Sequence, residues 1–454
     1  MVLAIGSLQT TNDYKAGFYN PFKAVEYYNT ALRYFDSILS RRSEKSLQAL
    51  IVIIIWMLES NALQDDGGDL WHMSRFCMSL AMELGVHRFN PDWNFGEPRN
   101  ETRNRLFWST YIIDRTVAMK FGRGLSLRNQ AIDTPLPKLS NDDYLVPDDG
   151  IDLLTNYNQV HFLPCIMLTK ICRIGGDMLE SIYISRTVGA APILSDEKII
   201  EMKQTQQSEL NEWMVLVDRE IPKQLTCYYE LKARFNVSSI ILNRPSPSFP
   251  IPDTESILLC KSNCIECVNC YNQLLSRGWR ITPTCLHDMV NTGLTMIYCS
   301  WRLDTDTQQV ELFSNDILKI MEEACRVFPK FKKFRQLFCL VSTAIVEHIK
   351  NMQQQEHQQQ HHLQQLQQQQ FHHQQQQVFA KDVPSNVMTS NPNEPQQPTG
   401  GIEVNGMILE WNDLFSQEGF QSGFKNYFDM GNDRLLNDLS EHFSEFSSTH
   451  PERQ

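Results

Sequence analysis

The chain has 454 residues, of which 42% are hydrophobic and 10% aromatic, enough for one large core or two average domains. Its formal net charge of −12 argues against a phosphate-binding surface over most of the chain, because nucleic-acid footprints need clustered lysine and arginine. The 12 cysteines are too sparse for a disulfide-rich secreted scaffold, so we expect reduced thiols in a cytosolic or nuclear compartment. No signal peptide is evident and the longest apolar run, 49–58, is about half a membrane span, so we expect no membrane association.

Apolar residues at helical spacing predict helices over most of residues 1–350. Ser43 should cap a helix that reaches Leu58, and a second helix should follow the glycine-rich turn at 65–69 and end near Gly85. A third helix, from about 100 to 121, is apolar on nearly every side. Such a helix is buried in a large helical domain.

Gly122 and Gly124 should end the third helix, and the residues from 134 to 150 are rich in Pro, Asp and Asn, which indicates a long surface connection. No strand-like alternation stands out, so the predicted fold class is all-α, as an irregular bundle or a solenoid-like stack without a fixed repeat. Further helices are predicted at 153–183, 195–217, 226–243, 254–277, 284–303, 314–326 and 331–351.

The composition changes at about residue 351. Residues 351–401 are dominated by Gln, His, Pro and Asn and cannot bury enough apolar surface to offset ordering entropy, so we predict a disordered linker. Weak metal binding by the interspersed histidines is the alternative. We disfavour it because nothing holds these histidines in a fixed geometry.

The last segment, 402–454, interleaves ten acidic residues with aromatic and leucine side chains. Acidic neighbours keep such side chains solvated, so that a partner groove can capture them in an induced helix, which is typical of an acidic activation segment. A terminal helix docked on the domain is the alternative. The candidate anchors of the activation segment are Trp411, Leu414, Phe415, Phe420, Phe424 and Phe428.

Charged and aromatic residues recur in a particular order between residues 71 and 137. The order is WHMSRF, LGVHR and ETRNRLFW, followed by a Tyr, an Asp-Arg pair and a Gly-Arg pair. A weaker block, LNRP, lies at 242–245. This order resembles the fungal-specific transcription factor domain, the middle homology region of Zn2Cys6 regulators, over roughly 20–350. Gly124 and Asn243 stand where that family usually has Pro and His. The motif residues are Arg75, Gly85, His87, Arg88, Arg103, Arg105, Trp108, Asp114, Arg115, Gly122, Arg123, Arg244 and Pro245.

The resemblance implies a helical regulatory domain in a nuclear protein that controls RNA polymerase II transcription of metabolic genes. It implies a homodimer in the full-length protein, contact of 402–454 with the transcription machinery or a coactivator, and control by a small-molecule effector or a partner protein. DNA and zinc would be bound only by an N-terminal cluster of six cysteines with C-x2-C-x6-C spacing.

No such cluster stands in this sequence, so we expect no cofactor in this chain. Either the sequence is truncated or the protein natively lacks the cluster. Truncation is favoured, because the sequence opens part-way into what resembles the domain. Target genes, and activation as opposed to repression, stay open.

Four cysteines, Cys260, Cys264, Cys267 and Cys270, lie within one predicted helix. Ligands on one straight helix cannot converge tetrahedrally on zinc, and free cysteine behaves as a small hydrophobe. Core packing is therefore favoured over metal binding or redox sensing.

Asp114 and Arg115 lie in an apolar helix where lone charges would be costly. We expect salt bridges that fix helix packing, formed together with the nearby arginines. An anion or effector pocket is the alternative, and His72 and His87 are interpreted as structural. The sequence has no phosphate loop, nucleophile elbow or metalloprotease helix, so an enzyme is not expected. A helical interaction scaffold or cofactor without its own DNA binding stays the alternative function, and an all-α enzyme is the weakest.

Overall fold

The chain divides into two compact units, one of residues 1–342 with 424–454 and one of residues 343–423. The predicted activation segment and most of the predicted linker lie outside the described residues, and those of the second unit that are described, up to Gln365, are helical. A computed structural model of the chain describes residues 1–10, 24–60, 68–139, 162–183, 187–188, 191–192, 195–246, 248–303 and 307–328, with scattered residues from 331 to 365.

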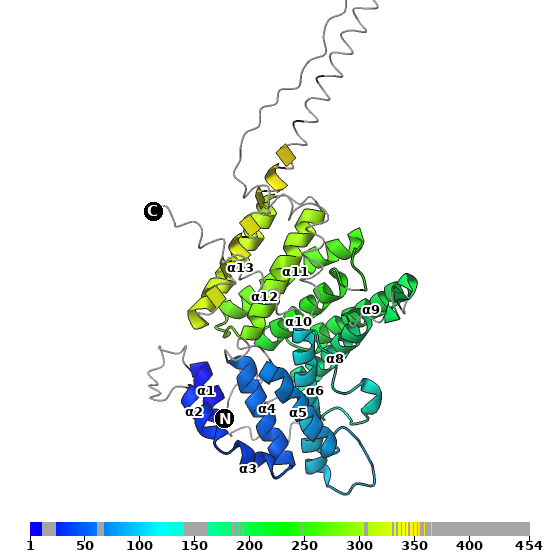
Figure 1. The fold of residues 1–454 in the computed structure, drawn as a ribbon, viewed down its shortest axis with the longest axis vertical. Coiled ribbons are helices and arrows are strands. Elements are labelled where there is room, and N and C mark those ends of the chain that lie inside the picture. Colours follow the sequence, from blue (N-terminus) through cyan, green and yellow to red (C-terminus); the bar gives the residue numbers. More distant parts are fainter. Residues whose placement is uncertain are drawn as a thin grey trace, which may run out of the picture. The chain divides into compact units, whose positions relative to one another are not determined.

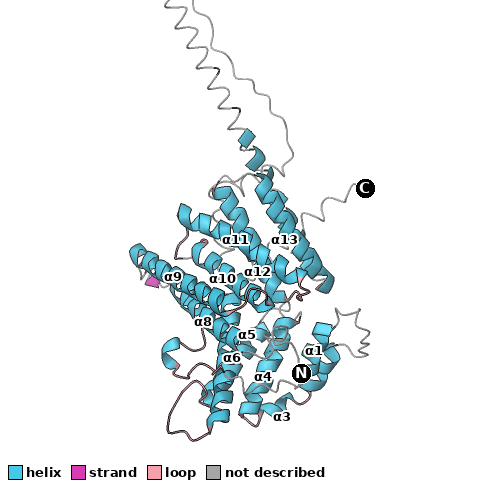
Figure 2. Ribbon diagram, turned by 180° about the vertical axis from the view of Figure 1, so that it is seen from behind, coloured by secondary structure: helices cyan, strands magenta, loops and turns pink. Residues whose placement is uncertain are grey.

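Helices make up nearly all of the described secondary structure (Figure 2). The first half contains α1 (Val2–Thr10), α2 (Ala24–Leu32), α3 (Phe35–Leu39), α4 (Glu44–Glu59), α5 (Gly68–Glu83), α6 (Glu97–Phe121) and the 3-10 turn η2 (Asn129–Ala131). The second half contains α8 (Leu163–Met178), the π-helical turn η3 (Leu179–Tyr183), α9 (Asp196–Glu220), α10 (Thr226–Asn243), α11 (Thr254–Ser276), α12 (Pro283–Arg302) and α13 (Thr307–Val327). In the described ranges the strands β1 (Thr187–Val188) and β2 (Ala191–Pro192) form a two-residue antiparallel pair, and the all-α prediction is confirmed.

Helix ends follow local capping chemistry. The Ser43 hydroxyl accepts a hydrogen bond from the Ser46 amide, and the Ser46 hydroxyl accepts one from the Ser43 amide, so two free donors at the start of α4 are satisfied. Helix α6 begins at Glu97, slightly earlier than predicted, because Pro98 fits the first helical turn. It ends at Gly122, whose φ of 57° lies in the left-handed region that glycine adopts at little cost.

Two of the predicted boundaries need correction. The helix predicted over 153–183 starts at Leu163 within the described residues and widens into the π-helical turn, while 153–161 lie outside them. The helix predicted at 314–326 is longer, from Thr307 to Val327, because its apolar periodicity begins earlier, at Val310. Helices α1 to α3 were not individually predicted; they are short and only weakly buried.

Helices that follow one another in the chain pack side by side (Figure 1). Helices α4, α5 and α6 share one hydrophobic cluster, and α8, α9 and α10 share a second with Ala118 of α6. Phe107 and Tyr111 of α6 belong to the first cluster, so this helix contributes to both. Helices α11, α12 and α13 follow, and α12 also contacts α4. None of the described helices combines the length and apolarity needed to cross a bilayer.

Candidate functional site

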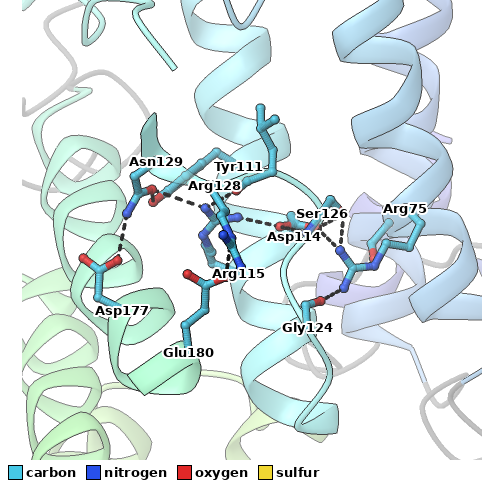
Figure 3. Close-up of polar contacts among 12 residues, drawn as sticks. Arg75, Tyr111, Asp114, Arg115, Gly124, Ser126, Arg128, Asn129, Asp177 and Glu180 are labelled. Carbon is cyan, nitrogen blue, oxygen red and sulfur yellow. Dashed lines mark hydrogen bonds and ion pairs between the residues drawn. The ribbon is translucent and has the colours of Figure 1, made fainter. Parts of the chain in front are cut away.

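The motif residues Asp114 and Arg115 lie side by side in the middle of α6, and both side chains are fully shielded from solvent. Arg115 Nη1 donates to Asp114 Oδ2 over 2.7 Å. The other oxygen of Asp114 receives Arg75 Nη1 of α5 at 3.2 Å and the hydroxyl of Ser126 (Figure 3). One carboxylate is therefore held between two guanidinium groups, one of them entirely buried.

The connection after α6 wraps around this ion pair. Gly122 turns the chain, and Arg75 then donates to the Gly124 carbonyl and to the Ser126 hydroxyl. Arg115 Nη2 donates to the Leu127 carbonyl over 2.6 Å. The connection is thus tied to both α5 and α6 through the same two arginines.

A second set of contacts ties the cluster to α8. The Tyr111 hydroxyl donates to Asn129 Oδ1 over 2.8 Å, and Asn129 Nδ2 donates to Asp177 Oδ1 over 3.0 Å (Figure 3). The Arg115 guanidinium lies over the Tyr111 ring, 4.2 Å from its centroid. Helix α8 comes so close that a Cβ on Gly176 would lie 2.9 Å from Arg115 Nε, which explains the glycine.

Burial dominates the electrostatics of the cluster. It lowers the pKa of Arg75, against the opposing effect of Asp114, and it raises the pKa of Asp177. Burial also raises the pKa of Tyr111 to about 12, so its hydroxyl stays a donor at neutral pH. Arg128 pairs with Glu180 at 3.3 Å closer to the surface, where solvent weakens the interaction.

Arg103 and Arg105 do not reach Asp114. They lie about two to three turns earlier on α6 and serve other contacts. Arg103 pairs with Glu44 at the start of α4 (2.8 Å) and donates to the Leu84 carbonyl at the end of α5 (2.8 Å). Burial works to raise the pKa of Glu44, but hydrogen bonds from its arginine partners outweigh it and lower that pKa.

Several other motif residues of the first half fasten loops to the helices. Arg105 pairs with Glu101 (2.7 Å), which also accepts the amide of Lys138. Trp108 Nε1 donates to the Pro135 carbonyl over 2.8 Å. Two further motif residues, Arg88 and His87, hold the start of the same segment, residues 133–138. Arg88 pairs with Asp133 (2.9 Å), and the His87 carbonyl accepts the Asp133 amide (3.3 Å).

Four motif positions have separate roles in the packing. Gly85 has a φ of 67° where the chain leaves α5. Arg123 lies over the Trp71 ring, 4.9 Å from its centroid. Arg244 is buried in the second half, where it donates to the Tyr183 hydroxyl at 3.0 Å, and Pro245 beside it is buried as well. The weaker LNRP block is therefore not part of the Asp114 cluster.

Sequence reasoning missed several partners of the motif residues, namely Glu44, Ser126, Asn129, Asp177 and Gly176. Ser126 and Asn129 lie in the gap between Gly-Arg and Ile-Asp of the motif series, which is a weak signal. The partners on α4 and α8 leave no signal in the sequence, because these contacts depend on which helices pack against each other.

The cysteine stripe of α11 faces the protein interior. Cys260, Cys264, Cys267 and Cys270 are each at most 2% exposed. Burial raises the pKa of Cys264 and Cys267 well above that of a free thiol, so both stay protonated and unreactive. Within the described part of the chain, no three His, Cys, Asp or Glu side chains are grouped so that they could hold a metal ion. Core packing therefore accounts for these thiols.

The arrangement around Asp114 joins helices, and its central ion pair is closed to solvent. Both oxygens of Asp114 accept hydrogen bonds from the protein, and neither Asp114 nor Arg115 reaches solvent. Arg115 Nε has no hydrogen-bond partner and faces the backbone of Gly176 at close range. General acid–base or nucleophilic chemistry would need an accessible group within hydrogen-bond reach of a substrate.

Comparison with known proteins finds similarity over a large part of the chain. The family described as "Fungal specific transcription factor domain" matches residues 1–221. Pyrimidine pathway regulatory protein 1 of Saccharomyces cerevisiae is 23% identical over 350 residues, covering 72% of this chain and 37% of that protein. Transcriptional activator protein acu-15 of Neurospora crassa is 21% identical over 308 residues, covering 63% and 32%.

A third relative is Activatory protein CHA4 of Saccharomyces cerevisiae, 25% identical over 199 residues, which cover 42% of this chain and 28% of that protein. The chain thus spans well under half the length of these relatives. No solved structure matches the chain.

Proposed function

We propose that the chain, whose residues 1–221 match the fungal specific transcription factor domain family, is the regulatory and activating part of a fungal Zn2Cys6-type transcription regulator. Its targets would be genes of metabolism transcribed by RNA polymerase II. The names of the relatives support a regulatory role, since they include a pathway regulator and two activators. The protein would act in the nucleus.

The observation that carries this proposal is the placement of the family motif. Asp114 and Arg115 are sealed inside the helical domain and tie α5, α6 and α8 together, so they serve as scaffold. In some proteins buried ion pairs select one arrangement of packed helices, and we propose the same role here. In such a domain, the binding of an effector or a partner protein would be transmitted through the packing of the helices. This role is regulatory and converts no substrate.

DNA binding and zinc belong to a different segment in this proposal. A binuclear cluster needs six cysteine thiolates, and no group of described cysteines is arranged so that it could hold a metal ion. The zinc cluster would therefore lie on another part of the full-length protein, which would also supply homodimerisation.

Activation is assigned to residues 402–454, which lie outside the described residues. The alternation of acidic and aromatic side chains supports this assignment, since aromatic anchors can enter a hydrophobic groove on a coactivator. Trp411, Phe415 and Phe420 are the anchors we expect to matter most.

Fusing 402–454 to an unrelated DNA-binding module tests the assignment in a reporter strain. We expect the fusion to raise reporter output and the triple change Trp411→Ala, Phe415→Ala, Phe420→Ala to abolish the gain. The matched control replaces Ser416, Gln417 and Gln421 by Ala and should keep it. An inactive wild-type fusion that is expressed and nuclear would rule out activation by this segment.

A further inference from the structure

We draw no further inference here: the strongest candidate, the exposed surface patch of Phe89 and Trp93 in the connection between α5 and α6, carries none, because nothing in the structure shows what covers it.

Discussion

Replacing Asp114 by Asn tests the scaffold role of the family motif. The substitution keeps the shape of the side chain but removes the one negative charge between Arg75 and Arg115. Arg115 is 0% exposed and has no other described carboxylate within ion-pair distance. Breaking a buried pair by removing one partner costs about 3–5 kcal/mol, because the other charge stays buried and uncompensated.

Urea unfolding followed by tryptophan fluorescence measures this loss. We expect Asp114→Asn to lower the free energy of unfolding by about 3–5 kcal/mol with an unchanged m-value. Asp316→Asn is the control, since Asp316 forms an exposed pair with Lys319 that is worth about 0–1 kcal/mol. A loss below about 1 kcal/mol in Asp114→Asn would refute the reasoning.

A double-mutant cycle separates the pair from its surroundings. Arg115→Met removes the guanidinium and leaves Asp114 with Arg75 and Ser126 as partners. If the two charges stabilise each other, the double variant should be more stable than the sum of the single losses predicts, by about 1–3 kcal/mol. Additive losses would mean that the two residues act independently.

Gly176→Ala should destabilise the domain by about 1–3 kcal/mol, because its Cβ would lie 2.9 Å from Arg115 Nε, whereas Gly124→Ala has open space and should change stability little in the same urea assay. Glu44→Gln should lower stability at pH 7 and much less at pH 3. The pKa of Glu44 is lowered in the folded chain, so its contribution is present above its unfolded pKa and is lost as the pH falls through the folded pKa. A thiol reagent should modify the exposed Cys339 in the native chain but reach the buried thiols of α11 only after unfolding, as counted by mass spectrometry.

Local sequence signals determined much of the secondary structure. The predicted range 226–243 coincides with α10, and Ser43 caps α4 as expected. Helical periodicity and capping depend on residues within about one turn of each other, so they can be read without knowing the tertiary fold. The end of α6 follows from the local sequence too. Gly122 adopts the required left-handed conformation, which costs a glycine little.

The sequence by itself also determined the chemical character of the motif, since an Asp-Arg pair inside an apolar helix requires partners. Only the tertiary structure decided which partners. Arg115 meets Gly176 across two helices, and Lys120 meets Asp288 over a separation of 168 residues. Such contacts depend on how whole helices pack, and no local pattern encodes them, so the scaffold around Asp114 became visible only in the folded chain.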